Sequence, residues 1–161
     1  YLSLLVSSWM KLNSIEDTFD LSKKIGKLLS NGDVIFLYGE IGVGKTTFVR
    51  GLINNLEVEK GMVESQILSP TFNIVFDYEI KKLKIMHYDL FRLKNSTGIN
   101  ELGIFAEIED HITLIEWPEL IEKKPKNRIE MFFGYLDEDL KKRNLKIKGY
   151  GKWSNYDFKK I

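Results

Sequence analysis

The sequence predicts an α/β domain with a mixed sheet that has a parallel, buried core and an antiparallel C-terminal edge. Three observations predict this class. Strand-like and helix-like segments alternate in the first part of the chain, strand-like segments dominate later, and a glycine-rich loop joins a buried strand to a helix. A chain of 161 residues without repeats or linkers fits one domain over residues 1–161.

Composition excludes several other classes of protein. The chain is 43% hydrophobic and 29% charged, which rules out a disordered or fibrous chain. It contains no cysteine, so a disulfide framework, a thiolate zinc site and a cysteine nucleophile are excluded. Residues 121–161 hold 12 Lys and Arg against 6 Asp and Glu, a net charge of +6. This basic end could meet an acidic partner or a phosphate backbone, or it could simply be a solvated face.

The apolar start of the chain is too short to cross a membrane. Residues 1–9 fall far below the ~20 apolar residues of a spanning helix, and they lack the basic region of a signal peptide. We expect these residues to lie outside the core fold or to form an added edge. We therefore expect a soluble, cytoplasmic protein.

Two helices are predicted in the first third of the chain. Ser14 precedes two acidic residues, which suits a helix N-terminus, and apolar residues then recur at helical spacing until Asn31-Gly32. The apolar run Val34–Tyr38 predicts a buried strand, and a second helix is expected over Lys45–Leu56.

The later elements follow from strand-like runs and turn signals. Two runs around a charged tetrapeptide predict a hairpin, and two more around an acidic tripeptide predict a second strand pair. The expected elements are strands at 71–78 and 83–87, a short helix or turn at 101–108, a buried strand at 112–115, and strands at 128–136 and 144–148 around a turn at 137–139.

Residues 39–46 match the phosphate-loop pattern G-x-x-x-x-G-K-[ST] at every fixed position. Glycines let the backbone wrap round a phosphate, inward N–H groups bind the anion, and the following helix adds the positive end of its dipole. Lys45 is expected to reach the β- and γ-phosphates, and the Thr46 hydroxyl to bind Mg²⁺. The motif predicts a three-layer P-loop NTPase-like domain. Its expected nucleotide-binding residues in this loop are Ile41, Gly42, Val43, Gly44, Lys45, Thr46 and Thr47.

Such a site also needs an acid at the end of a neighbouring strand. Glu116 follows the buried strand at 112–115, and we assign it to the metal, directly or through water. Asp89 follows residues 85–88, and we expect it to orient the attacking water or a switch loop. Either acid could instead be an ordinary residue at a strand end.

The sequence favours ATP as the nucleotide. The base-reading motif N-K-x-D of guanine-specific proteins is absent. A small-molecule kinase on this scaffold remains an alternative, although four arginines are few for clamping donor and acceptor phosphates. A non-catalytic, nucleotide-gated binding module is the second alternative.

The chain resembles the TsaE (YjeE) family, small bacterial ATPases of tRNA threonylcarbamoyladenosine synthesis, over about residues 14–120. The phosphate loop alone is shared by many families, but three further blocks are more specific. The blocks, in order, are Leu37–Phe48, Ser69-Pro70-Thr71-Phe72, His87-Tyr88-Asp89-Leu90-Phe91-Arg92-Leu93 and Glu116-Trp117.

The resemblance implies a role for each matching residue. It implies slow ATP hydrolysis by the isolated protein and the partners TsaD and TsaB, with tRNA reached through their complex. The resemblance implies that Lys45 and Thr46 bind the nucleotide and Mg²⁺, that Thr71 lies in a switch loop, and that Asp89 supports hydrolysis. It implies that Glu116 is the second residue on the metal side and that Trp117 lies near the nucleotide or a partner. It also implies that the segment around Ile15 to Thr18 contacts the adenine.

Three further side chains have simpler expected roles. His87 lies in an apolar run, so we expect a core histidine rather than a catalytic base. His111 starts a strand and is expected at the surface. Arg92 is the one plausible internal cation for the γ-phosphate, although it could pair with Asp89 or Glu116 instead.

Overall fold

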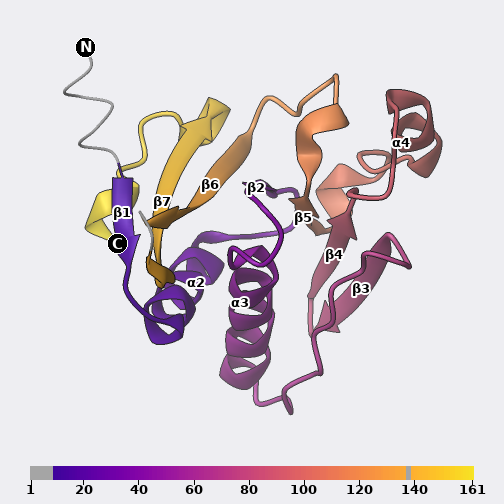
Figure 1. Cartoon of the computed structure of the whole chain (residues 1–161). Helices are drawn as coiled ribbons and strands as arrows, with labels where there is room; N and C mark the ends of the chain where they lie inside the picture. The colour runs from indigo at the N-terminus through magenta and orange to yellow at the C-terminus, as the bar shows by residue number, and fades with distance from the viewer. Residues whose placement is uncertain (1–8, 137–138) are drawn as a thin grey trace.

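The computed structural model describes residues 9–136 and 139–161; residues 1–8 and most of the turn expected at 137–139 lie outside the described residues. One sheet runs through the molecule, with the strand order β1-β7-β6-β2-β5-β4-β3 (Figure 1). The strands are β1 (Trp9–Leu12), β2 (Val34–Tyr38), β3 (Val75–Ile80), β4 (Leu83–Asp89), β5 (Ile112–Glu116), β6 (Arg128–Leu136) and β7 (Asp139–Tyr150).

The predicted mixed sheet is confirmed. β2 pairs in parallel with β5 and β6, and β4 pairs in parallel with β5. β3 pairs antiparallel with β4, and β6 pairs antiparallel with β7, so both predicted hairpins are present. The sheet extends one strand further than expected, because β1 pairs antiparallel with β7 and forms the edge. Trp9, which we expected outside the core fold or in an added edge, begins this strand.

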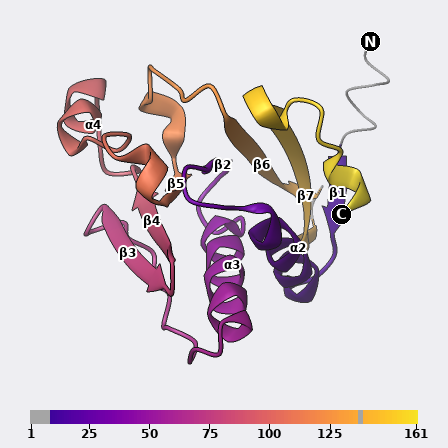
Figure 2. The ribbon, with the colours of Figure 1, turned by 180° about the vertical axis from the view of Figure 1, so that it is seen from behind.

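Helices cover both faces of the sheet, which confirms the three layers. Alternate residues of β2 belong to two separate cores, Ile35 and Leu37 to one and Val34 and Phe36 to the other. The first core lies under α2 (Ile15–Leu28) and α3 (Lys45–Glu59), which run side by side in both views (Figures 1 and 2). The second core includes α4 (Ser96–Leu102) and the short 3₁₀ turns at 108–110 and 118–120.

The ends of α2 and α3 follow local signals. The Ser14 hydroxyl accepts a hydrogen bond from the Asp17 N–H at 3.2 Å, which confirms the predicted N-cap. α3 continues to Glu59 rather than ending at Leu56. The helix ends just before Gly61, whose φ of 74° is the left-handed conformation found at the C-terminus of many helices.

Two predicted segments differ from the structure. Residues 71–74 form a turn, and β3 begins only at Val75, because Ile74 has a φ of 69° that breaks the extended backbone. The helix expected at 101–108 begins earlier, at Ser96, where the Asn95 side chain accepts from the Gly98 N–H. It ends at Gly103, whose φ is 59°. A left-handed residue at the first place and local capping residues at the second therefore outweighed the apolar pattern.

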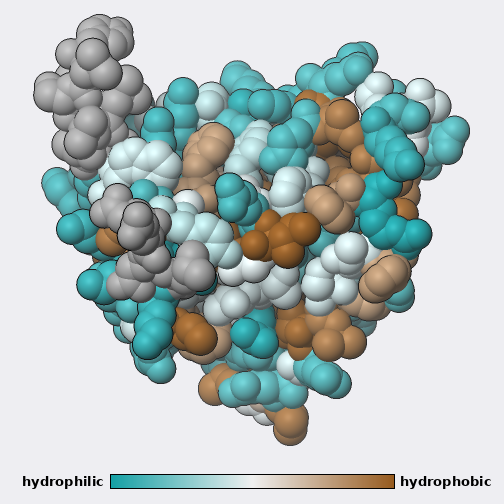
Figure 3. Space-filling view, in the orientation of Figure 1, coloured by the Kyte–Doolittle hydropathy of each residue, from teal (hydrophilic) through white to brown (hydrophobic). Residues whose placement is uncertain are grey.

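The described part of the chain contains no helix with the length and apolar character needed to cross a membrane. The space-filling view shows hydrophobic residues interspersed with hydrophilic ones on the face of Figure 1 (Figure 3).

Gly51 sets how closely α2 and α3 can pack. The Ser22 side chain is fully buried between the helices, and its hydroxyl donates to the Phe19 carbonyl at 2.7 Å. A Cβ added at Gly51 would overlap Ser22 Oγ and lie 2.6 Å from the Phe19 ring. The position of α3, which carries the phosphate loop at its N-terminus, therefore depends on a glycine here.

We expect Gly51→Ala to lower the free energy of unfolding by about 1–3 kcal/mol, because the extra methyl group forces α2 and α3 apart. Gly26→Ala is the matched control, since its Cβ would meet Leu52 at an ordinary 3.5 Å. Urea denaturation of both variants tests this. Equal stability of the two variants would contradict the close packing at Gly51.

Candidate nucleotide-binding site

The phosphate loop occupies the turn between β2 and α3. Gly44 caps α3 with a φ of 119°, a left-handed conformation that disfavours other residues. Gly39 has no room for a side chain, because a Cβ there would lie 2.8 Å from the Phe133 carbonyl oxygen. The first turn of α3 contains no acidic residue, so the positive end of the helix dipole is open to an anion.

The C-terminal hairpin holds this loop from outside. The Tyr135 hydroxyl donates to the Ile41 carbonyl at 3.3 Å, and Arg143 Nε donates to the Val43 carbonyl at 2.9 Å. Tyr135 and Arg143 are partners in the β6–β7 register, and the guanidinium lies 4.4 Å from the centre of the Tyr135 ring. Two loop carbonyls are thus directed outward, toward the hairpin.

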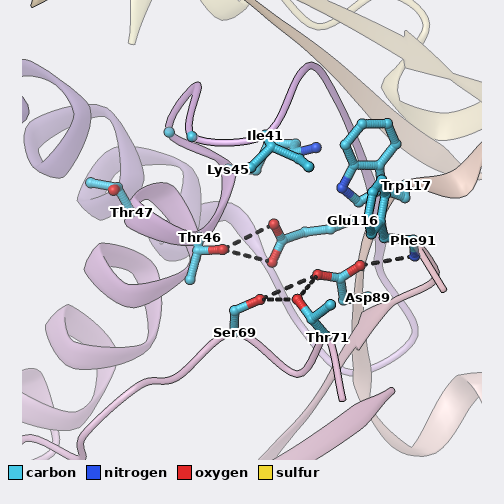
Figure 4. Close-up of a pocket in the computed structure, with 12 residues that line it drawn as sticks. Ile41, Lys45, Thr46, Thr47, Ser69, Thr71, Asp89, Phe91, Glu116 and Trp117 are labelled. Carbon is cyan, nitrogen blue, oxygen red and sulfur yellow. Dashed lines mark hydrogen bonds between the residues drawn. The ribbon is translucent and has the colours of Figure 1, made fainter. Parts of the chain in front are cut away.

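A cavity of about 260 Å³ opens beside the loop (Figure 4). It combines residues of the loop, the first turn of α3 and the ends of β4 and β5. The lining residues are Ile41, Gly42, Gly44, Lys45, Thr46, Thr47, Ser69, Thr71, Asp89, Phe91, Glu116 and Trp117.

The Thr46 hydroxyl faces the carboxylate of Glu116. Its Oγ1 lies 3.0 and 3.1 Å from the two Glu116 oxygens, as Figure 4 shows. Glu116 ends β5 and is almost completely buried. A hydroxyl and one carboxylate match the oxygen ligands that Mg²⁺ takes from proteins, since this ion keeps several waters and phosphate oxygens as its other ligands. The two side chains therefore fit the expected Mg²⁺ site.

Asp89, the register partner of Glu116 on the neighbouring strand, is the centre of a second cluster at the cavity. One carboxylate oxygen, Oδ2, accepts from the Thr71 hydroxyl at 2.8 Å and from the Ser69 hydroxyl at 3.2 Å. The other oxygen accepts from the Phe91 N–H at 3.0 Å. Asp89 thereby holds the turn that contains Thr71 against the end of β4.

Lys45 is folded back within the loop. Its ammonium donates to the Gly39 carbonyl oxygen and lies 3.7 Å from the centre of the Trp117 ring. Burial lowers the pKa of Lys45, and the nearby carboxylates, Glu116 foremost, oppose that effect. Trp117 adopts a left-handed backbone (φ 58°) and also packs on Phe91, with ring centres 4.9 Å apart.

The structure brings together most of the expected site residues, but not all. Lys45, Thr46, Thr71, Asp89 and Glu116 line one cavity, together with Ile41, Gly42, Gly44 and Thr47. Three expected nucleotide contacts do not line it: Ile15 is 58% exposed at the start of α2, whereas Thr18 and Val43 are buried. Contact of Ile15 and Thr18 with the adenine, and of Val43 with the nucleotide, stays a prediction.

One alternative considered for Arg92 and one prediction for His111 are wrong. Arg92 does not pair with Asp89 or Glu116; its Nη1 donates to the Phe72 carbonyl at 3.3 Å. His111 is buried rather than on the surface, and burial lowers its pKa.

Sequence reasoning missed three residues of this region. Ser69 and Phe91 line the cavity but were given no role. His87 is buried as expected, and its Nε2 also lies 2.6 Å from Glu116 Oε2. The available signal was spacing, because His87 stands two residues before Asp89 and so faces the same side of the strand.

Comparison with known proteins gives consistent matches. The family model "Threonylcarbamoyl adenosine biosynthesis protein TsaE" matches residues 12–145. The chain is 36% identical over 142 residues to "tRNA threonylcarbamoyladenosine biosynthesis protein TsaE" of Rickettsia bellii, covering 88% of this chain and 96% of that protein. The protein of the same name from Aquifex aeolicus is 38% identical over 136 residues, covering 84% and 92% of the two chains.

A solved structure shares the fold. "Crystal structure of Bacillus subtilus YdiB" is similar with a TM-score of 0.71 and 24% sequence identity. The match covers 91% of this chain and 87% of that chain, so the shared fold includes nearly all of both proteins.

We expect Asp89→Ala to loosen the turn at 69–74, because the Ser69 and Thr71 hydroxyls and the Phe91 N–H lose their common acceptor. Amide hydrogen exchange of the segment 66–74 should become faster in the variant. Asp77→Ala, on the exposed side of β3, is the control and should leave the segment unchanged. Unchanged exchange in Asp89→Ala would show that this carboxylate does not hold the turn.

Proposed function

Because the chain belongs to the TsaE family, we propose that it binds ATP with Mg²⁺ and hydrolyses it during the synthesis of tRNA threonylcarbamoyladenosine. The matching family model and the similar proteins of Rickettsia bellii and Aquifex aeolicus are all TsaE proteins of this biosynthesis, which supports the pathway. The phosphate-loop residues Gly39–Thr46 support nucleotide binding.

One observation carries the proposal most directly: the phosphate-loop hydroxyl of Thr46 lies within 3.1 Å of the strand-end acid Glu116. These are the two positions that hold Mg²⁺ in phosphate-loop nucleotidases. A bound Mg²⁺ would neutralise charge that develops on the phosphates. Thr46 and Glu116 would hold the ion, and Asp89 would fix the turn with Thr71 beside the γ-phosphate.

Lys45 would have to leave Trp117 to meet the β- and γ-phosphates. In the structure the Lys45 ammonium donates to the Gly39 carbonyl and lies over the face of the indole ring. Phosphate oxygens are stronger acceptors for an ammonium, because both partners are charged. Nucleotide binding would therefore exchange these contacts for charge-assisted ones.

The isolated protein is proposed to hydrolyse ATP slowly. All four arginines lie in the described part of the chain, and none of them lines the cavity. Arg92 contacts Phe72, Arg143 contacts Val43, and Arg128 lies 3.4 Å from Glu130. A cation over the γ-phosphate is worth several orders of magnitude in related enzymes, so its absence here favours completion of the site by partners.

We propose the TsaD and TsaB proteins as these partners, with tRNA reached through their complex in the cytoplasm. Part of the basic C-terminal region is engaged within the domain, since Lys124 lies 3.6 Å from Glu130 and Arg143 holds the phosphate loop. We propose that the net charge of +6 on residues 121–161 attracts an acidic surface of that complex.

Lys45→Ala should weaken ATP binding about tenfold to hundredfold. A charge-assisted contact contributes about 1.5–3 kcal/mol, and each 1.4 kcal/mol is a factor of ten in affinity. Isothermal titration with ATP and Mg²⁺ measures the loss. Lys60→Ala, at the far end of α3, is the control and should bind like the wild type. Unchanged affinity in Lys45→Ala would remove the proposed site.

Purified protein should hydrolyse ATP slowly and speed up when TsaD and TsaB are added. Phosphate release measured with and without the partners tests this. The Lys45→Ala variant should release little phosphate under either condition. Equal rates with and without partners would contradict a site completed by them. Phosphate transfer to a small molecule would favour the kinase alternative, and tight binding without any turnover would favour the binding module.

A further inference from the structure

We infer that His87 is a positioning residue that holds the Glu116 carboxylate in the orientation facing Thr46. The inference rests on the proposed Mg²⁺-nucleotide function of this site. It assigns to a buried strand residue a role beyond packing, although His87 does not line the cavity itself.

The sheet register brings the two side chains together. Asp89 is paired with Glu116 across β4 and β5, and His87 lies two residues before Asp89. His87 is therefore the diagonal neighbour of Glu116 on the strand next to it, a separation that long side chains can bridge. The His87 Nε2 atom lies 2.6 Å from Glu116 Oε2, and the two side chains are only 0% and 3% exposed.

Glu116 needs this second donor because it is shielded from water. The Thr46 hydroxyl has one hydrogen, shared between two carboxylate oxygens at nearly equal distances of 3.0 and 3.1 Å. Such a symmetric contact leaves rotation of the carboxylate about its last bond weakly restrained. His87 approaches only Oε2, from β4 rather than from α3, so its contact breaks the symmetry and fixes the rotation.

The hydrogen-bond geometry of the ring favours one of its two neutral tautomers. Among the described residues, Nδ1 of His87 has no hydrogen-bond partner although it is buried. A neutral ring that carries its hydrogen on Nε2 donates to Glu116 and leaves only a lone pair without a partner. The opposite tautomer would bury an N–H without an acceptor and place two acceptors 2.6 Å apart, which is far more costly.

Fixing Glu116 matters for a metal site, because groups that orient a metal ligand typically change metal affinity 10- to 100-fold when removed. His87→Leu removes the donor and keeps an apolar side chain. His87→Gln keeps an N–H donor at a similar reach. The other histidine, His111, directly precedes β5 and so lies at the end of that strand opposite Glu116. His111→Gln is therefore a matched control outside the site.

The experiment measures binding of a fluorescent ATP analogue at increasing Mg²⁺ and, separately, in EDTA. For His87→Leu, the half-saturating Mg²⁺ concentration should rise about 10- to 100-fold, whereas affinity in EDTA stays unchanged. His87→Gln should lie within a few-fold of the wild type, and His111→Gln should match it.

A second measurement covers the case in which His87→Leu does not fold. The ¹⁵N spectrum of the histidine rings in the wild-type protein without nucleotide reports which nitrogen carries the hydrogen. We expect Nε2–H for His87, and we expect its ring signals to shift in Glu116→Gln. A ring protonated only on Nδ1 would overturn the inference.

The other outcomes separate this inference from the proposed function. Mg²⁺-dependent binding by the wild type together with an unaffected His87→Leu would overturn the inference alone. Equal losses with Mg²⁺ and in EDTA, not rescued by His87→Gln, would reduce His87 to a packing residue. If the wild type binds the ATP analogue equally well with and without Mg²⁺, the proposed metal site is wrong, and the inference about His87 with it.

Discussion

The parallel pairing of β2, β5 and β4 is the constraint on which the site depends. The register places Leu37, Glu116 and Asp89 in one row across the three strands. Because parallel strands end at the same edge of a sheet, both acids arrive beside the phosphate loop that follows β2. The buried interior of these strands, with Ile35, Ile85 and Leu114 fully shielded, stabilises that row.

Around this row, each neighbouring group acts on one of the two acids. Thr46 and His87 contact Glu116 from α3 and β4, and Ser69 and Thr71 contact Asp89 from the turn before β3. The two carboxylates therefore have separate partners. This division agrees with separate proposed roles, one at the metal and one at the turn that carries Thr71.

The sequence predicted the parts of the fold that local patterns encode. β2 and β6 have the predicted bounds, because an apolar run or a strand-like run ends at clear turn signals. β1 was not predicted as a strand, since four residues carry little periodicity and its stability comes from pairing with β7. The turn at 71–74 was missed because Ile74 adopts a left-handed conformation that β-branched residues rarely take. Contacts such as His87–Glu116 join residues that are distant in the chain, so spacing predicts a shared face but not the hydrogen bond.

The C-terminal hairpin contacts the phosphate loop, and these contacts limit when the site can form as the chain is synthesised. Tyr135 and Arg143 follow their loop partners by 94 and 100 residues. β2 also needs β5 and β6 as neighbours, and both are made later. Synthesis adds residues from the N-terminus at about 5–20 per second. Several seconds therefore pass between synthesis of the loop and synthesis of Tyr135 and Arg143, which contact it. The loop can therefore take up these two contacts only after Arg143 has been synthesised, when most of the chain is present.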